Sequence, residues 1–141
     1  MINKLKGFTI IELIVVIAII AVLASIVMVN VTQYINKSKD SSIKANLKTL
    51  QINAAIWFSD DNKGHGSYAG FAETNDHKAP ISAIVNSGGT YTHTIVSSDY
   101  CVDSTLSSHT ADNPNHWCID DTGFAGRGTC VEGIACIEET E

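Results

Sequence analysis

The stretch NKLKGFTIIELIVVIAIIAVLASIVMVN, residues 3–30, decides the fold of this chain. Its run from 13 to 29 holds 17 residues, interrupted by Ser25 alone and without a charge. With the apolar residues on either side it exceeds 20 positions, which is enough for one bilayer crossing at about 1.5 Å per residue. The sequence therefore predicts a membrane-spanning helix over about 8–31.

The charges before this run set its expected orientation. Lys4 and Lys6 precede it without any acid, so the N-terminus should stay cytoplasmic and the rest of the chain should lie outside. A cleaved secretory signal, with residues 22–24 in place of an A-x-A exit, and a plain single-pass anchor are two simpler explanations. Neither explains Glu12 near the start of the run, nor Gly7 just before it.

Glu12 needs a partner, because a carboxylate at the bilayer centre costs about 2.5–3.5 kcal/mol. A cut between Gly7 and Phe8 would create an α-amino group on Phe8 that is largely protonated at neutral pH. Glu12 lies four residues further on, on the same helical face and in the first turn, where the helix dipole favours an anion. The amine of the same chain or of a neighbouring copy could then supply the counter-charge.

The stretch KGFTIIELIVVIAIIAVLA resembles the N-terminus of type IV pilins and of type II secretion pseudopilins. The matching features are a basic leader, Gly7, Phe8, Thr9, Glu12 and the apolar run that follows. The resemblance is strong over residues 4–35. It implies that a prepilin peptidase cuts after Gly7 and methylates the Phe8 amine, and that Glu12 pairs with the N-terminus of an adjacent subunit.

The same resemblance implies a structural filament subunit rather than an enzyme, without a cofactor. Its expected partners are identical or related pilin subunits, the prepilin peptidase, the pilus assembly platform and, before assembly, the bacterial inner membrane. The chain would then leave that membrane for an extracellular filament.

Many family members have Gly where this chain has Ala21 and Pro where it has Val29. Both helix breakers are missing, and Ala is the best helix former.

A second helical pattern follows in YINKSKDSSIKANLKTLQINAAIWF. One apolar stripe recurs there at i, i+4, i+7, i+11 and i+14: Ile43, Leu47, Leu50, Ala54 and Trp57. The two patterns together predict one long helix over 8–58, apolar all round in its first half and on one face in its second. Trp57 and Phe58 should pack in a core. Residues 59–80, rich in Gly and Asp, are expected to form a loop between helix and sheet.

Residues 81–141 carry short β-type stretches separated by turn residues: GTYTHTIV, DYCVDSTL, HWCIDDTG, GTCVEG and IACIEE. They predict an external antiparallel sheet of about four strands. YCVDST (100–105) and WCIDDT (117–122) resemble each other and are expected to be adjacent hairpin strands. The predicted fold class is therefore α+β and pilin-like: residues 1–7 form a leader, and a long helix packs against a small sheet.

Four cysteines lie in the predicted external domain: Cys101, Cys118, Cys130 and Cys136. An even count on the oxidising side of a membrane suggests two disulfides, and three pairings are possible. If the two similar strands lie antiparallel with their cysteines level, Cys101 joins Cys118 and Cys130 joins Cys136. No metal site is expected, because C-x₂-C spacing is absent and the five histidines are scattered.

Composition narrows the function. No Ser/His/Asp signature, phosphate loop or H-E-x-x-H motif occurs. The net charge is −6, and loss of Lys4 and Lys6 with the leader would make it −8, so DNA binding through phosphate neutralisation is not expected. A membrane-anchored monomeric ectodomain that acts as a binding module is the alternative. The sequence leaves major pilin, minor pilin and pseudopilin open.

Overall fold

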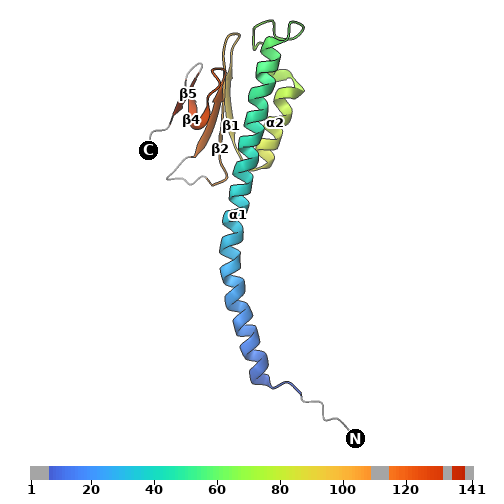
Figure 1. Cartoon of the computed structure of the whole chain (residues 1–141), viewed down its shortest axis with the longest axis vertical. Helices are drawn as coiled ribbons and strands as arrows, with labels where there is room; N and C mark the ends of the chain where they lie inside the picture. Colours follow the sequence, from blue (N-terminus) through green and yellow to red (C-terminus); the bar gives the residue numbers. More distant parts are fainter. Residues whose placement is uncertain (1–6, 109–114, 132–134, 139–141) are drawn as a thin grey trace. The chain divides into compact units, whose positions relative to one another are not determined.

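The computed structural model describes residues 7–108, 115–131 and 135–138 (Figure 1). The chain divides into two units, 1–35 and 36–141. One helix runs through both units, and the second unit adds short helices and a sheet. The elements are α1 (Ile10–Ser59), η1 (Phe71–Glu73), α2 (Asn75–Asn86), β1 (Tyr91–Ile95), β2 (Tyr100–Thr105), β3 (His116–Asp120), β4 (Ala125–Val131) and β5 (Ala135–Glu138). The predicted α+β, pilin-like fold is confirmed.

The apolar stripe on the second half of α1 builds the core of the second unit. Ile43, Leu47, Leu50 and Ala54 are fully buried, as their helical spacing predicts. The sheet lies along this half of α1 (Figure 1). Full burial of the isoleucine and the two leucines contributes about 1.5–3 kcal/mol each. The core is completed by Tyr68, Phe71, Ile81, Ile84, Tyr100, Val102, Leu106 and Ile119, with Trp57 and Phe58 packed against it.

A polar residue on the same helix fastens α1 to the sheet. The side-chain amide of the buried Gln51 donates to the carbonyl of Asp120 at 3.1 Å and to that of Phe124 at 2.9 Å. These carbonyls flank the turn between β3 and β4. Each carbonyl also accepts a longer bond from a backbone N–H of the turn, so Gln51 adds a second donor to each and fixes the turn against the helix.

Helix α2 occupies residues that the sequence analysis assigned to a loop over 59–80 and to a β region from 81. The loop prediction is wrong from residue 75 onward, where α2 begins. Thr74 caps the helix by accepting a hydrogen bond from the backbone N–H of His77. Pro80 lies inside α2 and cannot donate to the carbonyl of Asp76. The side-chain amide of Asn53 donates to that carbonyl at 2.7 Å instead, so α1 compensates for the proline.

The sheet has five antiparallel strands in the order β1-β2-β3-β4-β5, one more than predicted. Each of the five β-type stretches read from the sequence overlaps one strand, although β4 begins three residues before GTCVEG. β4 pairs with β3 through 125–127 and with β5 through 128–131. At the junction lies Gly128, where a Cβ would come within 2.2 Å of the carbonyl oxygen of Ile137. Only glycine permits this close approach of two backbones.

His77 is a buried ionisable group in this core. Its side chain is 3% exposed, and neither ring nitrogen has a hydrogen-bond partner among the described residues. Its ring centroid lies 5.5 Å from that of Phe71 and 5.4 Å from that of His93. Burial, followed by the positive charges of His93 and Lys78, lowers the pKa of His77 to about 4, while Glu73 acts in the opposite direction. The imidazole is therefore neutral at pH 7.

This lowered pKa predicts a loss of stability in mild acid. The unfolded chain takes up a proton on His77 near pH 6.5, whereas the folded chain does so only near pH 4. The free energy of unfolding is thus highest above pH 6.5 and falls as the pH drops toward 4. At pH 5 the loss from this residue is about 2 kcal/mol. Urea unfolding of the full chain in detergent, followed by near-UV circular dichroism at pH 7.5 and 5, measures it.

The control is His77→Phe, which keeps a ring between Phe71 and His93 and removes the titration. Its free energy of unfolding should change less between the two pH values than that of the parent chain. The difference isolates His77 from the carboxylates, which also titrate in acid. Equal pH dependence in parent and variant would contradict the assignment.

Candidate functional site

The start of α1 is closed by reciprocal hydrogen bonds between Thr9 and Glu12. The backbone N–H and the hydroxyl of Thr9 both donate to Oε2 of Glu12 at 2.9 Å. The backbone N–H of Glu12 donates back to Oγ1 of Thr9 at 3.3 Å, and the N–H of Leu13 donates to the carbonyl of Thr9. This is a capping box, in which a threonine and a glutamate three residues later satisfy the free N–H groups of the first turn.

The capping box gives Glu12 a second role that the sequence analysis missed. The signal was present as T-x-x-E directly before an apolar run, which is the usual signature of a capping box. Among the described residues, the other carboxylate oxygen, Oε1, accepts no hydrogen bond. Glu12 can thus cap its own helix through one oxygen and receive a donor from elsewhere through the other.

The proposed cut lies just outside the helix. Gly7 and Phe8 precede Ile10, where α1 begins, and both are exposed, Phe8 to 84%. No heavy atom lies within 4 Å of the point that a Cβ on Gly7 would occupy. The bond between Gly7 and Phe8 is therefore in a segment that a peptidase could reach in an extended form.

The surface of α1 within the first unit is apolar and uncovered. The large apolar side chains that are described between 10 and 28 and between 31 and 35 are about half exposed or more. Soluble monomers rarely expose a continuous apolar surface of this length, so lipid or other protein must cover it. By length and composition, α1 is the one helix in the described part of the chain that could cross a membrane.

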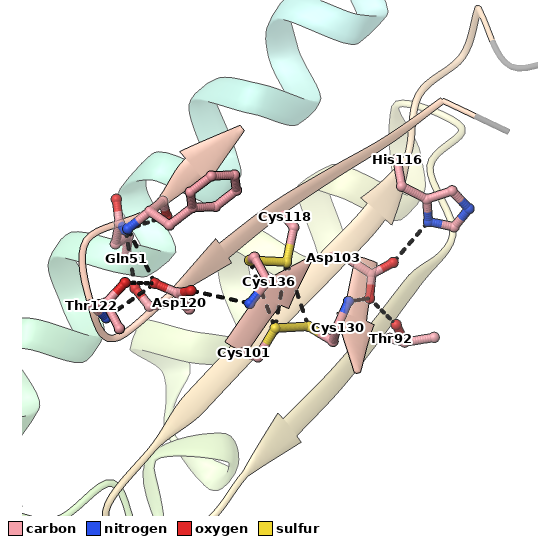
Figure 2. Close-up of a disulfide and its surroundings, with 11 residues drawn as sticks. Gln51, Thr92, Cys101, Asp103, His116, Cys118, Asp120, Thr122, Cys130 and Cys136 are labelled. Atoms are coloured by element: carbon pink, nitrogen blue, oxygen red, sulfur yellow. Dashed lines mark hydrogen bonds and ion pairs between the residues drawn. A yellow bond between two sulfur atoms is a disulfide. The ribbon is translucent and has the colours of Figure 1, made fainter. Parts of the chain in front are cut away.

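The disulfides correct the predicted pairing. The bonds are Cys101–Cys130 and Cys118–Cys136, so β2 is joined to β4 and β3 to β5 (Figure 2). The predicted bonds Cys101–Cys118 and Cys130–Cys136 are wrong. The premise of level cysteines fails, because Cys101 lies opposite Asp120 in the ladder between β2 and β3, whereas Cys118 lies opposite Asp103.

The similar strands 100–105 and 117–122 are antiparallel neighbours, as predicted, and the structure explains their likeness. Each contributes a Cys-x-Asp unit, and each unit holds one cysteine of the hairpin formed by β4 and β5. Cys101 bonds Cys130, while Asp103 accepts from the backbone N–H of Cys130 at 3.3 Å. In the second Cys-x-Asp sequence, Cys118 bonds Cys136, and Asp120 accepts from the N–H of Cys136 at 3.1 Å.

Both aspartates are 2% exposed, and their remaining partners are polar groups of neighbouring segments. Asp103 also accepts from the hydroxyl of Thr92 and forms a 2.8 Å contact with Nδ1 of His116. Asp120 accepts from both the N–H and the hydroxyl of Thr122, and from the N–H of Phe124. Buried carboxylates are tolerated only with such donors. The hairpin is thus fixed by two covalent bonds and two buried carboxylates.

Comparisons with known proteins found one matching family model and one similar pilin. The family described as "Prokaryotic N-terminal methylation motif" matches residues 2–28. The chain is also 40% identical over 67 residues to the "Type IV major pilin protein PilA" of Myxococcus xanthus (strain DK1622), which covers 48% of this chain and 29% of that protein. The chain thus spans less than a third of the length of this relative. No solved structure matches.

The matched motif includes Gly7, Phe8 and Glu12, on which the resemblance to pilins rests. The similar protein is named as a major pilin, which is the class of protein that the sequence analysis expected. The chain thus carries the prokaryotic N-terminal methylation motif over residues 2–28 and is similar in part to a type IV major pilin.

Proposed function

We propose that this chain is a structural subunit of a type IV pilus-like filament. It is made as a precursor anchored in the bacterial inner membrane with its N-terminus in the cytoplasm. A prepilin peptidase cuts it after Gly7 and methylates the amine of Phe8. The assembly platform then adds the mature chain to identical or related subunits, and the second unit forms the outer part of an extracellular filament.

The observation that carries this proposal is the combination of an uncovered apolar helix with a single carboxylate in its first turn. Lipid would cover the apolar side chains before assembly, and neighbouring helices would cover them afterwards. Both surroundings have a low dielectric constant, which strengthens the attraction between Glu12 and the Phe8 amine of an adjacent subunit. This pairing would align neighbouring subunits along the filament.

Two measurements test the proposal. Mass spectrometry of the native protein should find a chain that begins with methylated Phe8. Electron microscopy should find surface filaments that disappear when this chain is deleted and return when it is restored. An uncut chain, anchored in the membrane and monomeric, would favour the alternative of a membrane-anchored binding module. A cut chain without surface filaments would favour a secretion pseudopilin.

Gly7→Leu should block processing. A peptidase that accepts a small residue before the cut has no room for the larger side chain, so the uncut precursor should accumulate in the membrane. Gly7→Ala is the matched control, since it adds only a methyl group in a place where nothing else lies within 4 Å. Immunoblotting and intact-mass analysis of membrane fractions measure the ratio of precursor to mature chain. Normal amounts of mature chain from Gly7→Leu would contradict the proposed cut.

A further inference from the structure

The part of α1 that follows the apolar run is basic, although the chain as a whole has a net charge of −6. Between residues 13 and 59 the only acid is Asp40. The same segment holds four basic residues, which are Lys37, Lys39, Lys44 and Lys48. This stretch of α1 is therefore positively charged in an acidic chain.

The lysines farther from the apolar run have partners. Lys44 Nζ lies 4.2 Å from the centroid of the Trp117 ring. Lys48 Nζ donates to Oε1 of Gln51 at 2.7 Å. The two lysines beyond α1 form ion pairs, Lys63 with Asp60 and Asp76, and Lys78 with Glu73. These four ammonium groups are thus already engaged within the second unit.

Lys37 and Lys39, the two lysines nearest the apolar run, differ from the others. Both are exposed, and among the residues that the structure describes neither forms an ion pair or a hydrogen bond. Asp40 is close in sequence, but its side chain is 9% exposed and its Oδ1 accepts from the backbone N–H of Ser108 at 3.2 Å. Within the described part of the chain, two ammonium groups are left without a counter-charge.

Chain length keeps these two lysines near the end of the apolar run. Lys37 follows Val31 by six residues and Lys39 follows it by eight, all within α1. Six helical residues advance by about 9 Å, and the headgroup layer of a bilayer is about 5–8 Å thick. Helical side chains also tilt toward the N-terminus of their helix, which here is the side of the apolar run. A long lysine side chain can therefore bring its ammonium group back to the headgroups.

The phosphate of a phospholipid is the counter-charge that this position offers. Residues two apart in a helix are about 200° apart around its axis, so Lys37 and Lys39 lie on nearly opposite sides of α1. A single anion could not contact both ammonium groups across the helix. A helix that leaves a bilayer is surrounded by headgroups, so each lysine can contact a different phosphate.

We propose that Lys37 and Lys39 bind the phosphate groups of anionic phospholipids in the outer leaflet of the membrane that α1 crosses. This inference rests on the proposed function, which places the apolar run in a bilayer and the second unit outside it. The two contacts fix the depth of α1 in the membrane before assembly. They are given up when the subunit leaves the lipid for the filament.

The test counts the lipids that remain bound to the full chain. The chain in detergent receives equal amounts of phosphatidylglycerol and phosphatidylcholine, and native mass spectrometry measures which lipid it retains. The parent chain should prefer phosphatidylglycerol. Each lysine near an anionic surface contributes about fivefold, so Lys37→Gln/Lys39→Gln should lower the preference by up to about 25-fold. Lys37→Arg/Lys39→Arg should keep it. The leader residues Lys4 and Lys6 are present in every variant and contribute equally.

Lys63→Gln/Lys78→Gln is the matched control, because it removes the same two charges far along the chain from the apolar run. It should leave the preference for phosphatidylglycerol unchanged. Equal preference in the parent chain and in Lys37→Gln/Lys39→Gln would overturn the proposal. An equal loss in the control variant would do the same, since it would show that net charge alone decides which lipid binds.

The lipid measurement requires neither the cut nor a filament, so its failure leaves the proposed function standing. Loss of filaments from Lys37→Gln/Lys39→Gln with an unchanged lipid preference would place the two lysines in a contact between subunits and overturn lipid binding. A chain that vesicles of neither lipid retain would overturn both membrane anchoring and this inference.

Discussion

Glu12→Ala is expected to leave a processed, membrane-resident chain that forms few or no filaments. Removal of a carboxylate makes insertion into the membrane easier or leaves it unchanged. The cut after Gly7 should largely survive, because it lies on the far side of Phe8. Assembly should fail, because the Phe8 amine of the neighbouring subunit would be buried without its counter-charge. Loss of one member of a buried ion pair costs about 3–5 kcal/mol.

The capping box makes Glu12→Ala ambiguous by itself, because that variant also removes a helix cap. Glu12→Gln separates the two roles. Glutamine can still accept from the N–H and hydroxyl of Thr9 in a capping box, but it carries no charge. If charge pairing drives assembly, Glu12→Gln should fail as Glu12→Ala does.

Thr9→Ala is the reciprocal variant, since it loses the threonine side chain of the cap and keeps the charge. The expected cost is about 0.5–2 kcal/mol of helix stability. Filaments should still form. Electron microscopy of sheared surface material and immunoblots of membranes measure assembly and retention in all three variants. Normal filaments from Glu12→Gln, or their loss from Thr9→Ala alone, would assign Glu12 to the cap rather than to assembly.

What the sequence predicted well depends on local pattern. The long helix follows from an apolar run joined to a stripe of helical period, and the stripe residues Ile43, Leu47 and Leu50 are buried as expected. The strands also followed from local composition. The capping box was equally local and could have been read from the T-x-x-E spacing at Thr9.

What the sequence did not predict depends on contacts between distant segments. Helix α2 contains Pro80, which argues against a helix unless another group satisfies the carbonyl of Asp76. That group is Asn53, 23 residues earlier in the chain. The pairing of the cysteines likewise depends on the ladder register and on the hairpin of β4 and β5 lying against β2 and β3. Neither can be read from the spacing of the cysteines.

Cys101→Ala/Cys130→Ala should lower the free energy of unfolding by about 3–4 kcal/mol. The bond closes a separation of 29 residues, and the loop-entropy relation gives a value of this size for such a loop. Cys118→Ala/Cys136→Ala, with a separation of 18 residues, should cost about 3 kcal/mol. In each variant the other native bond remains, and peptide mapping without reductant should find no free thiol.

Cys101→Ala/Cys118→Ala tests the pairing itself, because it removes one member of each bond and leaves Cys130 and Cys136 without their partners. Both native disulfides are then lost, so this variant should be less stable than either variant that removes a single disulfide. Cys130 and Cys136 lie opposite each other in the β4–β5 ladder, so they should be found free or bonded to each other. Denaturant unfolding of the three variants in detergent, without reductant, measures the order. If Cys101→Ala/Cys118→Ala lost the least stability of the three, the bonds would be Cys101–Cys118 and Cys130–Cys136. The role of the Cys-x-Asp units in holding the hairpin would then be refuted.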